Sequence, residues 1–396
     1  MNILYLTLFD LNKPSAGLNK IYRLREAIKH QNINFIVVGS GGTNGYWESK
    51  NNNDYQEILF NQNLFKSKKY SNFLKVISEA SKFYKRHLSE LVKKYEISGI
   101  IIYSPMGKVV ASISKSIKNL NVFIIADCGE YYNFSFHHLL NGVLLQQALF
   151  RYIQLKNFNG AIVPSPMWYK IASKLEIPKV LIPGLSSSSI KFRNSPSSSK
   201  KIINIVFMGR LNDRELPNVI FKALNSCIKR KVNFKFQLFG TRNEGYKEKN
   251  WIKKLKREKN LINKTKIYGF VSNKEKDKIL SEADIFIMLR PKNKESAHLF
   301  PSRIPEFMLS GNPTILSNVP SLNQFFIENK GVKFISSSNN PNDLSELIIS
   351  LANNPNKRFE IGQSGRKYAL ENFSFERMGN NLGNFLKNLN IINKNF

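Results

Sequence analysis

Cysteine is scarce in this chain, which has only Cys128 and Cys227 among its 396 residues. Neither cysteine has a second cysteine or a histidine at metal-ligand spacing, so the pair makes neither a disulfide framework nor a zinc site. The sequence therefore indicates a reducing compartment.

Long apolar runs are also missing. No segment approaches the roughly 20 apolar residues that span a bilayer. The N-terminal stretch MNILYLTLF has no basic region before its short apolar run, so we interpret it as a first strand and not as a secretory leader. We expect a cytoplasmic protein that is soluble or peripheral on the inner face of the plasma membrane.

Acidic residues are few, with 28 Asp and Glu against 60 Lys and Arg, which gives a formal net charge of +32. Such a charge favours anionic partners, namely nucleic acid, anionic lipid or phosphorylated substrates. Lys, Asn, Ile and Phe are all abundant, so a compositional bias of the genome is an equal explanation. The sequence leaves open whether the charge is functional or compositional.

What the chain does contain is a regular alternation of short apolar runs and helix-length amphipathic segments. Nearly continuous apolar runs are typical of parallel strands that are covered on both faces. Segments such as 16–31 and 73–95 carry apolar residues at three-to-four spacing, as helices do. We therefore predict an α/β fold. The apolar runs lie at 2–9, 34–41, 99–104, 122–127, 160–165 and 179–184, and then at 203–209, 234–240, 266–271, 284–290, 313–318 and 331–336.

A serine-rich polar segment at 186–201 separates the two series of runs and has the composition of a linker. A chain of this length is also too long for one compact core. We predict two Rossmann-like, doubly wound domains over 1–185 and 202–375, followed by a helix over 376–396 that packs back on the first domain. In such sheets ligands bind beyond the carboxyl ends of the strands.

Two strand ends carry candidate anion-binding groups. After the first strand, Gly17 stands at the start of a helix, where backbone can approach a ligand and free N–H groups attract anions. After run 203–209, Arg210 and Arg214 precede a helix, and paired guanidiniums at such a place suit a diphosphate. A plain strand-to-helix turn and a solvated basic loop are the structural alternatives.

A third strand end leads into HLFPSRIPEFMLSGNPTIL, residues 298–316. We expect Ser302 to cap a helix, the Ser302 and Arg303 amides to face a crevice, and Gly311 to end the helix. Glu306 lies one turn into this helix, where its carboxylate can accept two hydrogen bonds from vicinal hydroxyls such as a ribose diol. The alternative is a solvated surface carboxylate.

The stretch 298–316 resembles the donor-site segment of the retaining glycosyltransferases of family 4, whose GT-B fold has two Rossmann-like domains facing a central cleft. GRLNDRELPNVIFKAL resembles the family's glycine-rich strand end with its basic residue, and YGFVSNKEKDKILSEADIFIML is similar to the segment between these two. The resemblance implies an acceptor-binding domain over 1–185 and a nucleotide-sugar-binding domain over 202–375. It implies a nucleotide-diphosphate sugar as donor substrate, no cofactor and no metal, because cations and helix N-termini do a metal's electrostatic work.

For the nucleoside, the resemblance implies that Glu306 holds the ribose and that the backbone around Phe270 and Val271 meets the base.

For the donor diphosphate, the resemblance implies neutralisation by Arg214 together with Arg210. The amides of Ser302 and Arg303 would contact the phosphates, and Gly17 would let the N-terminal loop close over them.

One position departs from the family pattern. The family often has two glutamates separated by seven residues, the first of which touches the donor sugar, and His298 stands at that first position here. An imidazole does not accept the same pair of sugar hydroxyls as a carboxylate, so the donor sugar and the turnover are left open. A loop imidazole without a role is the alternative.

In the first half of the chain, Asp127 and Glu130 follow a predicted strand. Either carboxylate could orient or deprotonate an acceptor hydroxyl, and a structural or capping carboxylate is the alternative. The adjacent His137 and His138 have no partners at metal spacing, so we predict no metal site there.

The segment 66–95 combines an apolar stripe with many lysines. It is interpreted either as an ordinary helix that buries its apolar side or as a cationic surface that rests on an anionic membrane.

The predicted function is a metal-independent, retaining transfer of a sugar to a hydroxyl of a growing, lipid-linked bacterial surface glycan, such as a capsule, lipopolysaccharide or exopolysaccharide. The alternatives are a basic nucleic-acid-binding protein, a GT-B nucleotide-sugar epimerase and an inactive partner subunit. The charge is dispersed and no nucleic-acid-binding module is found, so we expect no specific nucleic-acid partner. The donor base and sugar, the acceptor, the linkage and the oligomeric state do not follow from the sequence.

Overall fold

A computed structural model describes residues 1–13, 15–42, 48–52, 55–61, 71–129, 142–186, 192, 202–240, 246–269, 271–337 and 339–394. The chain divides into two compact units. Unit 1 comprises Met1–Leu185 and Phe375–Phe396, and unit 2 comprises Ser186–Ser374. The predicted linker 186–201 lies almost wholly outside the described residues.

Unit 1 contains an eight-stranded sheet of order β3-β4-β2-β1-β5-β6-β7-β8. Within the described strands every pairing is parallel except that of β3 with β4. The central strand β1 buries Ile3 to Leu6 without a break, as a parallel strand covered on both faces requires. The strands are β1 (Asn2–Asp10), β2 (Asn34–Gly42), β3 (Glu48–Asn52), β4 (Tyr55–Asn61), β5 (Ile97–Tyr103), β6 (Phe123–Asp127), β7 (Gly160–Val163) and β8 (Lys179–Leu181).

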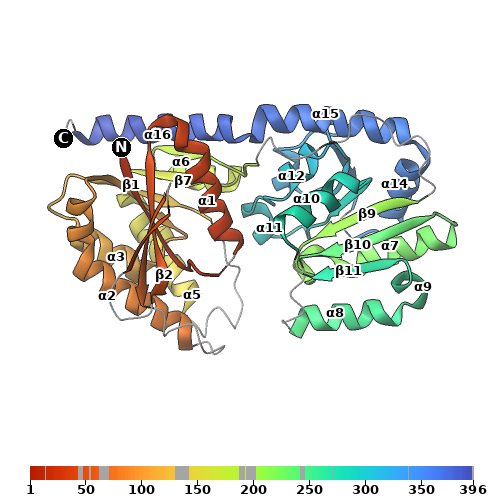
Figure 1. The fold of residues 1–396 in the computed structure, drawn as a ribbon, viewed down its shortest axis with the longest axis horizontal. Helices are drawn as coiled ribbons and strands as arrows, with labels where there is room; N and C mark the ends of the chain where they lie inside the picture. The colour runs from red at the N-terminus through yellow and green to blue at the C-terminus, as the bar shows by residue number, and fades with distance from the viewer. Residues whose placement is uncertain are drawn as a thin grey trace. The chain divides into compact units, whose positions relative to one another are not determined.

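Helices cover both faces of this sheet and form two separate apolar cores. One core includes Ile77 of α2 and Trp168 of α6, and the other includes Leu18 of α1 and Leu382 of α16. The last helix, α16, belongs to unit 1 and packs along α1, beside which it runs in Figure 1. The helices are α1 (Ala16–Ile28), η1 (Lys29–Gln31), α2 (Ser71–Lys94), α3 (Gly107–Ser116), α5 (Val143–Ala148), the π-helical turn η2 (Leu149–Gln154), η3 (Leu155–Asn157), α6 (Pro166–Lys174) and α16 (Phe375–Lys394).

Helix α2 accounts for most of the basic segment predicted at 66–95. Its apolar stripe, which includes Ile77, Tyr84 and Leu88, is buried in the unit 1 core, while lysines such as Lys85 remain exposed. The apolar stripe of α2 is therefore part of the hydrophobic core of unit 1. Across the described helices, none is both long and apolar enough to cross a membrane.

Unit 2 contains a six-stranded parallel sheet of order β11-β10-β9-β12-β13-β14. The chain builds outward from β9 through β10 and β11, then returns to place β12 on the other side of β9. This reversal makes the carboxyl ends of β9 and β12 a topological switch point, where ligands bind in open α/β sheets. The strands are β9 (Ile203–Met208), β10 (Phe234–Phe239), β11 (Thr265–Gly269), β12 (Ile285–Met288), β13 (Thr314–Ser317) and β14 (Val332–Ile335).

The helices of unit 2 flank this sheet (Figure 1). Close approach of α15 to the end of α12 depends on Gly362, because a Cβ there would lie 1.9 Å from the Gly311 carbonyl oxygen. The helices are η4 (Asp213–Glu215), α7 (Pro217–Lys229), α8 (Tyr246–Arg257), α9 (Lys259–Ile262), α10 (Asn273–Glu282), α11 (Lys294–His298), α12 (Ile304–Leu309), α13 (Pro320–Asn323), α14 (Pro341–Asn353) and α15 (Pro355–Phe373).

Candidate functional site

A cluster of two guanidiniums and one carboxylate occupies the switch point of unit 2. Arg303 donates one hydrogen bond to the carbonyl of Met208, at the end of β9, and another to Glu215 Oε1 at 2.8 Å. Arg290, two residues beyond β12, places its Nη2 3.2 Å from the same oxygen. Glu215 thus joins the segments that follow β9 and β12.

The backbone at the end of β9 leaves room for the Arg303 guanidinium of this cluster. Gly209 has a φ of +148°, and a Cβ there would lie 1.8 Å from Arg303 Nη1. Only glycine leaves room for the guanidinium and tolerates this backbone conformation. The side chain of Asn212 accepts a hydrogen bond from the Arg214 amide at 3.0 Å and starts the turn η4, which carries Glu215 inward.

The charge balance of the cluster is asymmetric. Glu215 is 3% exposed, and its Oε2 has no hydrogen-bond partner among the described residues. Arg290 and Arg303 keep about a fifth of their side-chain surface exposed, at 18% and 21%. One buried carboxylate against two partly accessible guanidiniums leaves a net positive charge, which suits an anion.

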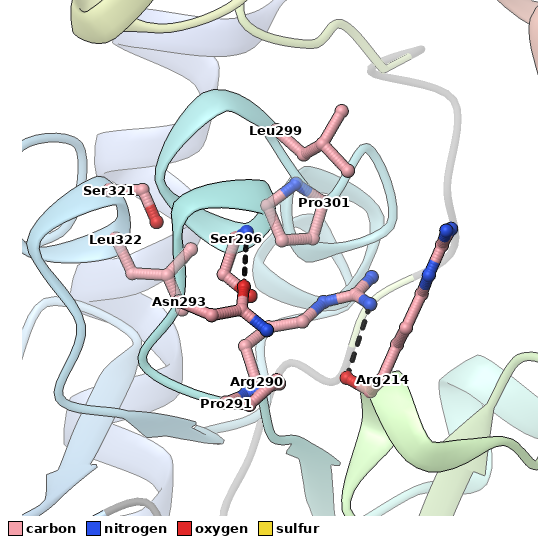
Figure 2. A pocket seen from close by; sticks show the side chains of 9 residues that line it. All are labelled: Arg214, Arg290, Pro291, Asn293, Ser296, Leu299, Pro301, Ser321 and Leu322. Carbon is pink, nitrogen blue, oxygen red and sulfur yellow. Dashed lines mark hydrogen bonds between the residues drawn. The ribbon is translucent and has the colours of Figure 1, made fainter. Parts of the chain in front are cut away.

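A small pocket adjoins this cluster (Figure 2). Arg290 Nη1 reaches the Arg214 carbonyl at 3.4 Å, and the Arg290 amide donates to Ser317 Oγ at 2.8 Å. The Arg214 side chain extends along the opposite side of the opening in Figure 2. The pocket therefore offers cationic groups beside small polar ones. Its lining residues are Arg214, Arg290, Pro291, Asn293, Ser296, Leu299, Pro301, Ser321 and Leu322.

Glu306 lies in the first turn of α12 and is 2% exposed, which excludes a solvated surface carboxylate. Lys276 of α10 places its Nζ 3.3 Å from Glu306 Oε2, and the lysine side chain is itself only 18% exposed. The lysine offsets the cost of burying the carboxylate. A ribose diol bound by Glu306 would share this carboxylate with Lys276.

The start of α12 differs from the prediction. The helix begins at Ile304, preceded by Arg303, and no side chain caps it, so the predicted cap by Ser302 is wrong. A backbone hydrogen bond from Ile304 N to the Pro301 carbonyl at 3.1 Å closes the turn instead, and Ser302 is exposed. The helix end is as predicted, since Gly311 has a φ of +77° and donates to Met308 O at 3.0 Å.

His298 ends α11 and is 4% exposed, so it is not a solvated loop imidazole. Its Nδ1 lies 2.6 Å from the Lys294 carbonyl, which can only accept. Nδ1 therefore carries a proton and donates to this carbonyl.

The other predicted residues of unit 2 are more exposed than the buried cluster or lie outside the described residues. Arg210 and Arg214 are exposed, and of these two Arg214 lines the pocket. Val271 is half-buried just after β11. Phe270 lies outside the described residues.

In unit 1, Asp127 is completely buried at the end of β6. The Tyr5 hydroxyl donates to its Oδ2, and Lys20 Nζ lies 2.5 Å from its Oδ1. Burial, followed by the charge of Asp127, raises the pKa of Tyr5 well above its usual value, so Tyr5 stays a donor. Both carboxylate oxygens are engaged, which favours the structural role over that of a base.

The remaining candidates of unit 1 are Gly17, Glu130 and the His137–His138 pair. A Cβ at Gly17 would lie 2.3 Å from the Phe9 ring, so the packing of α1 alone requires glycine there. Glu130, His137 and His138 lie outside the described residues. In the part of the chain that the structure describes, no three His, Cys, Asp or Glu side chains gather closely enough to hold a metal ion.

Sequence reasoning missed Glu215, Arg290 and Lys276. Arg290 had a readable signal, because it directly follows an apolar run at the edge where ligands bind. Glu215 follows three polar or charged residues and precedes Leu216 and Pro217 in NDRELPN, a pattern typical of a solvated turn before a helix. Lys276 is one of several lysines on α10 and has no distinguishing signal.

Comparison with known proteins gives a family match to the region that contains this cluster. Residues 188–368 match the family model described as glycosyl transferases group 1. Spore coat protein SA of Bacillus subtilis (strain 168) is 26% identical over 185 residues, which are 46% of this chain and 48% of that protein. The chain thus matches about half the length of this curated relative.

Solved structures resemble the whole chain. A glycosyltransferase from Rickettsia africae ESF-5 is 18% identical, with a TM-score of 0.73 and 98% of both chains covered. Sucrose-phosphate synthase from Thermosynechococcus elongatus is 14% identical, with a TM-score of 0.76 and 99% of both chains covered. Anabaena HepE in complex with UDP and glucose is 14% identical, with a TM-score of 0.69, covering 97% of this chain and 99% of that one.

At these identities the structural likeness shows the fold, and it confirms the predicted class of two parallel-sheet α/β units of the GT-B type. The family match covers most of unit 2, including Glu215, Arg290 and Glu306. The chain therefore has a GT-B type fold, and its residues 188–368 match the family model of the group 1 glycosyl transferases.

Proposed function

We propose that this chain transfers a sugar, with retention of configuration, from a nucleoside-diphosphate sugar to a hydroxyl of an acceptor, in the manner of family 4. The observation that carries the proposal is that Arg290 and Arg303 converge on Glu215 at the switch point, and that the buried Glu306 follows Arg303 by three residues, all within the region that matches the glycosyltransferase family. The cationic side chains of this unit suit the diphosphate of a nucleoside diphosphate, and a buried carboxylate that can accept hydrogen bonds from a diol suits its ribose.

The diphosphate would lie against the arginine side chains at the carboxyl ends of β9 and β12. Arg214 and Arg290, which line the pocket, supply positive charge, and the Ser302 and Arg303 amides precede α12. As the bond from the sugar to the diphosphate breaks, negative charge grows on the leaving oxygen, and fixed cations stabilise that charge more than they stabilise the ground state. No metal is needed for this stabilisation in the proposal.

The nucleoside would lie against α12 and the end of β11. Glu306 would accept hydrogen bonds from the ribose hydroxyls while it remains paired with Lys276. The backbone at Val271 would meet the base. His298, which stands where the family often has a glutamate that touches the donor sugar, would contribute to the choice of that sugar.

The acceptor proposed is a growing, lipid-linked surface glycan at the cytoplasmic face of the plasma membrane. The support is the net charge of +32, which favours an anionic membrane surface, together with the exposed lysines of α2. A uridine diphosphate sugar is the first donor to test, because the similar HepE has been solved with UDP and glucose.

The test is the thermal stabilisation of the chain by uridine, guanosine and adenosine diphosphates. We expect one of them to raise the melting temperature of the wild type, and Glu306→Gln to lose most of that rise. The ligand-dependent rise is the readout, because the loss of the Lys276 pair lowers the melting temperature of the variant by itself. Glu346→Gln is the matched control, since Glu346 pairs with Arg230 on the surface of the same unit. An undiminished rise in Glu306→Gln would remove Glu306 from the site.

A further inference from the structure

One short segment of unit 1 exposes an unusual amount of apolar surface. Leu145 of α5 is 61% exposed, and Tyr152 and Ile153 of η2 are 79% and 54% exposed. These three side chains lie within nine residues of one continuous helical segment. Leu74 of α2, 43% exposed, adjoins the start of α5, because its Cδ2 lies 3.2 Å from where a Cβ of Gly142 would be.

These four residues, Leu74, Leu145, Tyr152 and Ile153, are called the apolar patch. The unit 1 core does not need them, because the same segment packs inward through Val143, Phe150 and Leu155, all 5% exposed or less. Several large apolar side chains exposed together mark an interaction surface more often than chance exposure does. The chain also widens to a π-helical turn at η2, a local form that is frequent at functional sites.

The surface around the apolar patch is strongly basic. The segments 71–94, 107–116 and 143–157 hold ten Lys and Arg residues against two Glu, a formal charge of +8 with histidine neutral. Both acids are on α2, so α3 and the segment 143–157 have none. The guanidinium of Arg151 lies 5.7 Å from the ring of Tyr152, so charge and apolar surface alternate within one turn.

Hydrogen bonds join these elements into one surface. The backbone amide of Lys108 donates to Gln146 Oε1 at 2.8 Å, which ties α3 to α5. The Lys108 ammonium lies 3.4 Å from Ser78 Oγ, which ties α3 to α2. Gln154 Nε2 donates to the Gly107 carbonyl at 2.9 Å, which ties η2 to α3. The apolar patch and the basic side chains are therefore parts of the same layer.

We propose that the apolar patch docks unit 1 on an anionic bilayer. Tyr152, Ile153 and Leu145 enter the boundary between headgroups and acyl chains, where tyrosine is enriched in membrane proteins. The surrounding lysines and Arg151 meet the anionic headgroups. The inference deepens the proposed function, on which it rests for the lipid-linked acceptor that docking would bring within reach.

The positive charge of these segments favours anionic lipid over a second copy of the chain as the partner of the apolar patch. A symmetric dimer through this surface would set +8 against +8, because the same patch faces itself. An anionic bilayer offers the opposite charge and an apolar interior at the same place.

The test is co-sedimentation of the full chain with phosphatidylcholine vesicles that contain or lack phosphatidylglycerol, at low and high salt. We expect binding that needs phosphatidylglycerol and weakens with salt. The triple variant Leu145→Ser, Tyr152→Ser, Ile153→Ser should bind at least about tenfold more weakly. Its side chains are already exposed, so the fold is retained.

Two matched controls accompany this variant. Ile327→Ser removes an apolar side chain of 48% exposure from unit 2 and should leave vesicle binding unchanged. Lys85→Ser with Arg86→Ser removes two exposed charges of α2, the helix that carries Leu74, and should weaken binding more than Lys253→Ser with Lys256→Ser on α8 of unit 2. All four residues of these charge pairs are exposed.

The outcomes separate the inference from the proposed function. Thermal stabilisation by nucleoside diphosphate should be the same in the wild type and the triple variant, so a failure of nucleotide binding leaves the vesicle result intact. Three outcomes would each overturn the proposal that the apolar patch docks on a membrane. They are full vesicle binding by the triple variant, no vesicle binding by the wild type, and a wild-type dimer that dissociates in the triple variant.

Discussion

Replacing Glu215 by glutamine keeps its shape and removes the charge that joins Arg290 to Arg303. A hydrogen bond to a charged group contributes about 1.5–3 kcal/mol, roughly twice a neutral one. One such hydrogen bond, from Arg303 at 2.8 Å, and one ion pair, with Arg290 at 3.2 Å, converge on Glu215 Oε1, and glutamine would keep only the weaker neutral form of these contacts. Because both guanidiniums are partly exposed and screened, we expect a net loss of about 1–3 kcal/mol in the stability of unit 2.

Hydrogen exchange measured by mass spectrometry is the suitable assay, because it reports the stability of each unit separately. Amides of β9 and β12 should lose protection in Glu215→Gln, whereas those of β1 and β5 should not. Glu346→Gln, which breaks a pair whose two side chains are 53% and 57% exposed, should change protection by less than about 0.5 kcal/mol.

A double-mutant cycle identifies the partner. Glu215→Gln and Arg290→Gln should be less than additive by about 1 kcal/mol, because each removes the same interaction. Unchanged protection of β9 in Glu215→Gln, together with additivity in the cycle, would refute the idea that this buried carboxylate organises the switch point.

Three further predictions test the geometry elsewhere. Gly209→Ala should destabilise unit 2 by about 2–4 kcal/mol in urea unfolding, because its Cβ displaces the Arg303 guanidinium and its φ is positive; an alanine that is tolerated would contradict this packing. Lys20→Met should destabilise unit 1 by about 2–4 kcal/mol, since it leaves the buried Asp127 charge uncompensated, and addition of Asp127→Asn should restore part of the protection of β6 in hydrogen exchange. Burial raises the pKa of Cys227 to about 12, so between roughly pH 8.5 and 12 the unfolded thiol ionises while the folded one stays protonated, and stability falls as pH rises; Cys227→Ala should flatten the decline of the urea midpoint in this range.

The fold followed from the sequence because burial on both faces leaves a direct trace. Every position from Ile3 to Leu6 is apolar or aromatic in a strand whose residues are buried in two cores. Similar runs marked the other parallel strands except β4, whereas the polar edge strand β3 (ESKNN) and its partner β4 were not predicted. The end of α12 was equally readable, because Gly311 takes the left-handed conformation that a glycine after a helix usually has.

The candidate site was only partly readable. The position of Glu306 in a helix was predicted, but its pairing with Lys276, 30 residues away, depends on how α10 packs against α12. The burial of Glu215 depends on Arg303, 88 residues away in the chain, and no local pattern distinguishes it from a surface acid. The Ser302 cap failed because a backbone turn closes the start of the helix instead.

Helix α2 shows how one pattern can support two interpretations. Its apolar stripe indicated either a core helix or a membrane surface, and the structure buries the stripe. The apolar side chains now proposed to meet lipid are on α5 and η2, a segment that the sequence analysis did not single out.

The most direct test of the donor site is a crystal structure of the chain with the nucleoside diphosphate that stabilises it best. The account predicts ribose hydroxyls on Glu306 and phosphate oxygens against Arg290, Arg214 and the backbone that precedes α12. Nucleotide density at any other place on unit 2, with Lys276 still paired to a Glu306 that touches no ligand, would contradict it.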